Sequence, residues 1–239
     1  MKLDILAFAA HPDDTELSCA GTLAMHVANG DKVGVVDFTR GEMGTRGTPE
    51  IRDEEAKASA EILGLAVREN LKFEDAFFVN DKDHQLKVVT AIRKYQPDVI
   101  LANAIYDRHP DHGRASNLVV NSCFLAGLEK VKTVDTEGNK QKTWRPKAVY
   151  HYIQSQFITP DFIVDVSDAW DTKMKAIKAF KSQFHDPNSK EPETYISSPQ
   201  FMEMLESRGK ELGHSIGVKY GEGFTKDRNL GVKNLKDLL

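Results

Sequence analysis

Two short segments of this chain concentrate imidazole and carboxylate side chains. His11-Pro12-Asp13-Asp14 directly follows an apolar run, Leu3 to Ala10, and His109-Pro110-Asp111-His112 comes after a second run, Val99 to Ala102. Two histidines and one carboxylate, with one coordination position left open, form a common ligand set for catalytic divalent metals. Such a metal lowers the pKa of a bound water molecule to about 7 and prepares it for hydrolysis. The two segments together therefore predict a catalytic metal site.

The spacing within the first segment suits a single metal ion. His11 and Asp14 are separated by two residues across a predicted strand-to-helix turn, which lets both side chains face one ion. One of His109 and His112 would complete the set. On residue types alone, either histidine of the second segment can fill this place.

Helix capping is the alternative explanation for the acidic residues. Asp13, Asp14 and Thr15 could cap the helix that follows them, and Asp111 could cap a later helix. Either segment alone carries a high risk of a false assignment. The metal site is favoured because both segments stand behind a predicted strand, at matching places in the fold.

Strands and helices alternate along most of the chain, as judged from apolar periodicity and from glycine and proline stops. The predicted strands are 3–10, 33–38, 70–73, 98–102, 148–152 and 162–166. The predicted helices are about 17–27, 52–63, 83–95, 112–128, 168–184 and 199–212. A polar stretch with a Gly138-Asn139 turn, residues 133–144, is expected to form a hairpin or an exposed excursion.

This alternation predicts an α/β fold, namely a Rossmann-like, doubly wound, mostly parallel sheet with helices on both faces. Residues 1–239 are expected to form a single domain, with residues 225–239 as a surface tail. In the common strand order 3-2-1-4-5, the first and fourth strands are neighbours where the winding reverses, and ligands bind at their carboxyl ends. The two metal-binding segments follow these two strands, so the fold should bring them into one crevice.

Composition excludes several classes of protein. The chain has 239 residues, 40% hydrophobic and 28% charged, with a formal charge of −4, which gives no basic surface for nucleic acid. No apolar stretch approaches the ~20 residues of a membrane span, so a membrane partner is not expected. Cys19 and Cys123 are too few and too far apart for a disulfide framework. A cytoplasmic protein is expected.

At the metal-binding segments the chain resembles the PIG-L, or LmbE-like, zinc-dependent N-acetylglucosamine deacetylases. The resemblance covers most of residues 1–225 and continues through these further segments: Thr39-Arg40-Gly41-Glu42-Met43-Gly44-Thr45-Arg46-Gly47, Arg52-Asp53-Glu54-Glu55-Ala56, Ser182-Gln183-Phe184 and Tyr220-Gly221-Glu222-Gly223-Phe224. This wider pattern is similar to the bacillithiol-biosynthesis branch, which deacetylates N-acetylglucosaminyl-malate. Another N-acetylglucosamine conjugate or a chito-oligosaccharide is the alternative substrate.

The resemblance implies a ligand set and a metal. His11, Asp14 and His112 match the positions that hold the metal in this family. Zn²⁺ is the implied ion, with Fe²⁺ or another divalent metal as the alternative. A small-molecule N-acetylglucosaminide is the implied partner, and family members assemble as homo-oligomers, either hexamers or trimers.

The resemblance also implies the catalytic roles. Asp13 would be the general base, which takes a proton from the metal-bound water and returns it to the departing amine. His109 would stay protonated and stabilise the oxyanion, with Asp111 as the partner that holds its charge. Amide hydrolysis needs an activated water, a stabilised oxyanion and a protonated leaving group, and these residues would supply all three.

Further polar residues border the predicted crevice. Arg52 matches an arginine that the family places in its substrate pocket, where a guanidinium could bind a substrate carboxylate. Tyr195 matches more loosely a tyrosine that reaches the oxyanion in some members. For Arg40 and Arg46 a solvated loop is the favoured interpretation, and for His151 a core or surface role.

Three other functions are compatible with parts of the pattern. Non-haem iron oxygenases also use two histidines and one carboxylate, but Asp13 and His109 suit hydrolysis better. A dinucleotide-binding module would need a glycine-rich first turn, whereas residues 11–14 place negative charge there. A metal-binding protein without turnover would leave Asp13 and His109 without a role.

Overall fold

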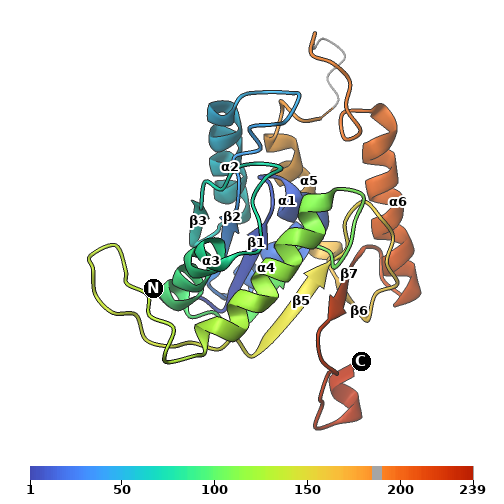
Figure 1. The fold of residues 1–239 in the computed structure, drawn as a ribbon. Helices are drawn as coiled ribbons and strands as arrows, with labels where there is room; N and C mark the ends of the chain where they lie inside the picture. Colours follow the sequence, from blue (N-terminus) through green and yellow to red (C-terminus); the bar gives the residue numbers. More distant parts are fainter. Residues whose placement is uncertain (185–189, 239) are drawn as a thin grey trace.

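The computed structural model of the protein describes residues 1–184 and 190–238. A seven-stranded sheet with the order β3-β2-β1-β4-β5-β7-β6 forms its centre. Strands β3, β2, β1, β4 and β5 run parallel to one another, whereas β7 runs antiparallel to both β5 and β6. The predicted doubly wound α/β fold is confirmed, and an antiparallel pair extends it at one edge (Figure 1).

The elements have the following bounds. The strands are β1 (Ile5–Ala9), β2 (Val33–Asp37), β3 (Val67–Asn70), β4 (Val99–Ala102), β5 (Ala148–Tyr152), β6 (Phe162–Asp165) and β7 (Gly221–Lys226). The helices are α1 (Asp14–Ala28), α2 (Pro49–Leu63), α3 (Lys82–Tyr95), α4 (Pro110–Ala126), α5 (Trp170–Ala179) and α6 (Pro199–Ser215). Short 3-10 helices cover Ser167–Ala169 and Leu235–Leu238.

Strand β1 lies between β2 and β4 and carries a core on each face. Leu6 and Phe8 belong to the apolar cluster that packs under α3 and α4, whereas Ile5 and Ala7 belong to the cluster on the opposite face. This alternation follows from the two-residue period of a strand. Helices α1, α2 and α5 pack together on one face and α3 and α4 on the other, so the winding reverses between β1 and β4 (Figure 1).

Strand β3 lies three residues earlier than predicted. It pairs with β2 from Gly34↔Val67 to Asp37↔Asn70, whereas the prediction placed it at 70–73. Charged residues concealed it, because Arg68 and Glu69 interrupt the apolar pattern. Arg68 can stay in this strand because its guanidinium donates to both carboxylate oxygens of Asp37, at 2.8 and 3.0 Å.

Strand β7 was not predicted, and its first residues show why. Gly221-Glu222-Gly223 has no apolar run and resembles a turn, yet Glu222 is buried. Its carboxylate accepts hydrogen bonds from the backbone N–H groups of Gly21 and Thr22 in α1 and lies 2.6 Å from Lys173 Nζ in α5. These partners satisfy the buried charge and attach β7 to the helix that follows the first metal-binding segment.

The remaining segments agree with most expectations. Residues 133–144 contain a bridge between Val134 and Lys140 around Gly138, whose φ is +84°, as expected of a hairpin. Cys19 and Cys123 are buried free thiols. Helix α5 ends at Ala179, earlier than the predicted residue 184, and the predicted tail begins inside β7. Among the described residues, no helix combines the length and apolarity that a membrane span requires.

Candidate metal centre and active site

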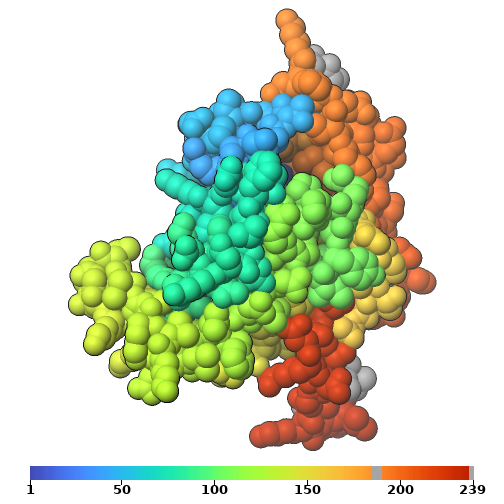
Figure 2. Space-filling view, in the orientation of Figure 1, coloured from blue at the N-terminus to red at the C-terminus, as the bar shows by residue number. Residues whose placement is uncertain are grey.

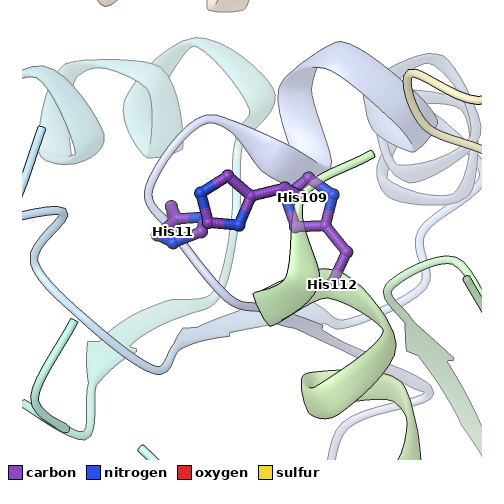
Figure 3. Close-up of side chains that lie close together, drawn as sticks. All are labelled: His11, His109 and His112. Carbon is purple, nitrogen blue, oxygen red and sulfur yellow. The ribbon is translucent and has the colours of Figure 1, made fainter. Parts of the chain in front are cut away.

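The first metal-binding segment and the start of α4 meet at the carboxyl ends of β1 and β4. His112 Nε2 lies 3.1 Å from Asp14 Oδ1, and His11 Nδ1 lies 3.6 Å from Asp14 Oδ2. Figure 3 shows the rings of His11, His109 and His112 gathered at this point, the latter two from the N-terminal end of α4. The structure thus brings together the three residues predicted to bind metal.

Two groups of side chains in the described part of the chain could hold a metal ion. One contains His11, His109 and His112, and the other contains His11, Asp75 and Asp111, with the ligand atoms of each group within 4.8 Å of one another. Asp14 stands beside the first group, in contact with two of its histidines. His109 is therefore a neighbour that could also reach the ion, in addition to the predicted set.

Carboxylates bind the far nitrogen of each predicted histidine ligand. His112 Nδ1 lies 2.6 Å from Asp107 Oδ2, which leaves Nε2 facing Asp14. His11 Nε2 lies 3.0 Å from Asp75 Oδ1 and 3.3 Å from Asp111 Oδ2, which leaves Nδ1 on the Asp14 side. Metal-binding histidines usually donate their other N–H to a carboxylate in this way. The donor set therefore fits a divalent metal.

Opposite charges fix the protonation of the metal-free cluster. Burial alone would lower the pKa of His112, but Asp14 and Asp107 raise it to about 9. Burial likewise opposes the charge of His11, and Asp111, Asp14 and Asp75 raise its pKa well above the ordinary value. Burial disfavours the Asp14 carboxylate, yet His112 and His11 lower its pKa well below the usual range. Without metal, protons take the place of the cation between these groups.

Asp13 differs from Asp14 in both backbone and surroundings. Its φ is 111°, a left-handed conformation that non-glycine residues rarely adopt. It occupies the N-cap position of α1, but its side chain makes no capping hydrogen bond. Arg52 Nη2 instead donates to Asp13 Oδ2 at 2.9 Å and also contacts the carbonyl oxygen of Pro12. Burial raises the pKa of Asp13 to about 7, against the opposing effect of Arg52. Capping does not explain this residue.

His109, not Asp111, is the N-cap residue of α4. Its Nδ1 accepts the backbone N–H of Asp111 at 3.3 Å, which leaves Nε2 to carry the ring proton. The Asp111 carboxylate accepts from Arg114 at 2.7 Å and from the N–H of Ala76 at 3.1 Å, and it contacts His11. Burial lowers the pKa of His109, and repulsion from the neighbouring histidines adds to this effect. Asp111 thus contacts His11, and its charge also opposes the lowering of the pKa of His109, so the predicted roles of His109 and Asp111 stay predictions.

A pocket of about 410 Å³ opens beside these residues. Its mouth lies where the loop after β2, the start of α4 and the segment before α6 meet, and Figure 2 shows the surface hollowed there. The lining includes Asp13, Asp14 and Arg52 at the centre, and apolar side chains of α6 along one wall. A water molecule and a small substrate can therefore reach the predicted base and ligands.

The outer residues singled out from the sequence have different places. Arg52 and Tyr195 both line the pocket, but Arg52 is buried against Asp13, and Tyr195 lies at the mouth with Arg108 stacked 4.3 Å above its ring. Arg40 pairs with Asp53 on the surface. These contacts give Arg52 a partner inside the site and leave Arg108 as a cation near the solvent.

Arg46 and His151 are both buried. Arg46 lines the pocket and donates to the carbonyl oxygen of Ser182 at 2.8 Å, so the solvated loop expected for it is wrong. His151 is buried between Ser116 Oγ at 2.9 Å and Asp227 Oδ1 at 3.1 Å, outside the pocket lining. The core or surface role favoured for His151 agrees with this position.

Four polar residues of the site were missed. Asn103 Nδ2 donates to Asp14 Oδ2 at 2.9 Å, and Gln154 Nε2 donates to Asp14 Oδ1 at 3.0 Å. Asp75 and Asp107 bind the histidine ligands as described above. Asn103 follows β4 directly and Gln154 comes two residues after β5, so a search for polar residues at carboxyl ends of strands would have found both.

Comparison with known proteins agrees with the geometry. Residues 6–123 match the family described as GlcNAc-PI de-N-acetylase, or PIG-L. A diacetylchitobiose deacetylase of Thermococcus kodakarensis is 29% identical over 92% of this chain and 81% of its own length. A 4-oxalmesaconate hydratase of Pseudomonas putida is 28% identical over 75% of this chain and 74% of its own. A probable N-acetyl-α-D-glucosaminyl L-malate deacetylase 2 of Bacillus cereus is 26% identical over 77% of this chain and 84% of its own.

The similarity extends to solved structures over nearly the whole chain. A conserved protein of Thermus thermophilus superposes with a TM-score of 0.85 and 36% identity, covering 97% of this chain and 98% of that one. The family match spans the first metal-binding segment, Arg52 and the second segment, the three stretches that the fold assembles into one site. The chain therefore belongs to the PIG-L family.

Proposed function

We propose that this protein is a metal-dependent N-deacetylase that hydrolyses the acetamide of an N-acetylglucosamine conjugate. The main observation in support is the position of Asp13, an arginine-bound carboxylate with a pKa near 7, adjacent to the Asp14–histidine cluster in an open pocket. A general base works best when its pKa lies near the operating pH.

The chain's own residues would share the work of hydrolysis. His11, Asp14 and His112 would hold the metal, Zn²⁺ being the ion we propose, and this ion would supply an acidified water molecule. Asp13, held by Arg52, would accept a proton from that water and return it to the amine nitrogen. His109 would donate a hydrogen bond from Nε2 to the developing oxyanion, which both the neutral and the protonated ring can do.

We further propose that the sugar carries an anionic aglycone such as malate. The relative from Bacillus cereus bears the name of such an activity. Arg52 is already bound to Asp13, so the cation that would meet the aglycone is Arg108, exposed at the pocket mouth beside Tyr195. A guanidinium is well suited to bind a carboxylate through two hydrogen bonds.

The test is an assay of primary-amine release with metal content measured on the same preparation. The substrates are N-acetylglucosamine, N,N'-diacetylchitobiose and N-acetylglucosaminyl-malate. Turnover that follows the metal content supports a deacetylase, and preference for the malate conjugate supports the anionic aglycone. A metal-loaded protein that releases amine from none of these substrates would contradict the proposal.

Arg108→Ala tests the aglycone contact directly. We expect a loss in kcat/KM for the malate conjugate and little change for free N-acetylglucosamine, since the contact lies away from the reacting bond. An equal loss for both substrates would assign Arg108 to the chemistry or the scaffold.

A hydratase is the second candidate, because one of the relatives reported above bears that name. A metal-bound water and a carboxylate base could also add water to an activated carbon–carbon double bond. Incubation with an unsaturated dicarboxylate, followed by loss of its ultraviolet absorbance, distinguishes this reaction from amine release.

A further inference from the structure

Two buried side-chain amides connect the carboxyl ends of β1, β4 and β5 around Asp14. Asn103 follows β4, and its Oδ1 accepts the backbone N–H of Ala10 at 3.0 Å. Since a backbone N–H can only donate, this contact fixes which end of the Asn103 amide is the oxygen. Asn103 Nδ2 must then point away from Ala10, and it donates to Asp14 Oδ2 at 2.9 Å and to Gln154 Oε1 at 3.0 Å.

The orientation of the Gln154 amide follows from the same reasoning. Gln154 Oε1 accepts from Asn103 Nδ2 and from the backbone N–H of Ala104, both at 3.0 Å. Turning this amide over would place its NH₂ group against two donors. Gln154 Nε2 is therefore held toward Asp14 Oδ1, at 3.0 Å, and toward His112 Nε2, at 3.3 Å. The amide thus donates to Asp14 and lies beside His112, two of the proposed metal ligands.

These donors use most of the positions at which the Asp14 carboxylate can accept a hydrogen bond or bind an ion. A carboxylate has about four acceptor positions, two on each oxygen. The backbone N–H of His11 and Asn103 Nδ2 occupy Oδ2, and Gln154 Nε2 occupies one position on Oδ1. The position that remains is on Oδ1, the oxygen that lies 3.1 Å from His112 Nε2.

We infer that Gln154 is a positioning residue for the metal centre, an inference that rests on the proposed metal-dependent function. Gln154 orients Asp14 so that one carboxylate oxygen can bind the ion. Its side chain ends in an N–H donor, which cannot bind the ion as a fourth protein ligand would. The coordination position for water then stays open. A purely structural role would require only the contacts of Gln154 Oε1 with Ala104 and Asn103.

Gln154→Glu separates the two roles. Glutamate keeps an oxygen for the Ala104 and Asn103 contacts but replaces the donor facing Asp14 and His112 with a second carboxylate oxygen. We expect Zn²⁺ to bind this variant more tightly than wild type and to raise its Tm by more, because the ion relieves repulsion between the carboxylates and gains a ligand. Turnover should fall by roughly 10–100-fold, since the added ligand competes with water.

Gln154→Leu provides the opposite change. Without the donor, Asp14 is less well oriented, and the Kd for Zn²⁺ should rise roughly 10–100-fold, the usual cost of losing such an outer contact. Gln156→Glu is the matched control, because it makes the same charge change two residues further on, where the side chain is exposed and outside the pocket lining. It should bind Zn²⁺ as wild type does.

The measurements are the Kd for Zn²⁺ by chelator competition and Tm with and without Zn²⁺, neither of which needs a substrate. Opposite shifts of Kd in Gln154→Glu and Gln154→Leu support the inference. A Kd within about twofold of wild type in both variants, or weaker binding in both, would overturn it. Should Gln154→Glu fail to fold, an unchanged Kd in Gln154→Leu is sufficient to reject it. A wild type that binds Zn²⁺ but releases no amine would reject the proposed function without affecting this result.

Discussion

Asp13 and Asp14 are adjacent in the sequence, yet the fold gives their carboxylates opposite surroundings. Burial disfavours the Asp14 carboxylate, but His112 and His11 lower its pKa well below the usual range. Three N–H groups also donate to it. Asp13 has a single arginine partner, and burial raises its pKa to about 7. Two carboxylates with separated pKa values can take different roles, one as a permanent ligand and one as an acid–base group.

Replacing Asp13 with asparagine should separate metal binding from turnover. Asparagine keeps an oxygen for Arg52 and tolerates a positive φ better than most residues, so we expect Asp13→Asn to fold and to retain its metal. The variant cannot accept the proton, so kcat should fall by roughly 10²–10⁴. Metal analysis and amine release on one preparation measure both effects. Asp14→Asn, the control, should lose metal, and the reverse pattern would exchange the two roles.

Protons and metal should compete for the cluster. The pKa of His112 is about 9 without metal, above the ordinary 6.5. Its charge therefore stabilises the metal-free protein fully below about pH 6.5, and this stability is lost as pH rises toward 9. Because the ion must displace this proton and the one on His11, whose pKa is also raised, its apparent affinity should rise by about tenfold per pH unit for each displaced proton between pH 6.5 and 8. Chelator competition at several pH values measures this, and a flat profile would show that His112 is not a ligand.

The sequence predicted the role of a site residue only where that residue belongs to a recognisable motif. The two histidine–aspartate segments identified the residues of the cluster. That each segment follows one of two neighbouring strands predicted that they lie together. Asp75 and Asp107 lie in loops, and no local pattern distinguishes them from solvated acids, so their contacts with His11 and His112 required the fold. The contact of Asp111 with His11 likewise required the fold, because the two residues are remote in sequence.

At the scale of the elements, β7 connects the sheet to the helices that support the site. Glu222 in β7 is bound by α1 and by Lys173 of α5, and all of these groups are buried. Helix α1 begins at Asp14, so its position also sets the position of the proposed ligand. A buried ion pair is costly to break from one side, because the remaining charge is left in a medium of low polarity.

Lys173→Met should therefore destabilise the protein strongly. The loss should be on the order of 3 kcal/mol, equivalent to a fall in Tm of roughly 10 °C for a chain of this size. Lys175→Met, two residues away on the exposed side of α5, is the control and should change Tm little. Thermal unfolding followed by circular dichroism makes the comparison. Similar values for the two variants would mean that the hydrogen bonds from α1 satisfy Glu222 alone.

Elements with apolar runs were predictable, and those built from charged or glycine residues were not. Strands β1 and β4 are continuous apolar segments, and β2 is apolar up to its last residue, Asp37, as parallel strands covered on both faces usually are. Strand β3 contains Arg68, and β7 contains Glu222, whose partners are remote in sequence. The local pattern cannot reveal that a distant residue will satisfy such a charge.

At the scale of the whole molecule, the site is assembled from segments that span most of the chain. The pocket lining runs from His11 to Gly223, and metal held by the proposed ligands would link the segments that follow β1 and β4. Metal at about 100 times its Kd should stabilise the fold by about 2.7 kcal/mol, a rise in Tm of roughly 5–10 °C. Removing metal with a chelator should reverse this rise. In His11→Ala the rise should be absent, and its persistence there would place the ion elsewhere.

Because of its left-handed backbone, position 13 is a place where stability and the proposed activity favour different residues. A non-glycine residue with a φ of 111° costs on the order of 1–3 kcal/mol, and the carboxylate is also buried. Asparagine would relieve part of that cost while removing the proposed base. A laboratory library sorted only for folded yield or heat resistance should therefore accumulate inactive molecules at position 13, whereas sorting for turnover should retain aspartate.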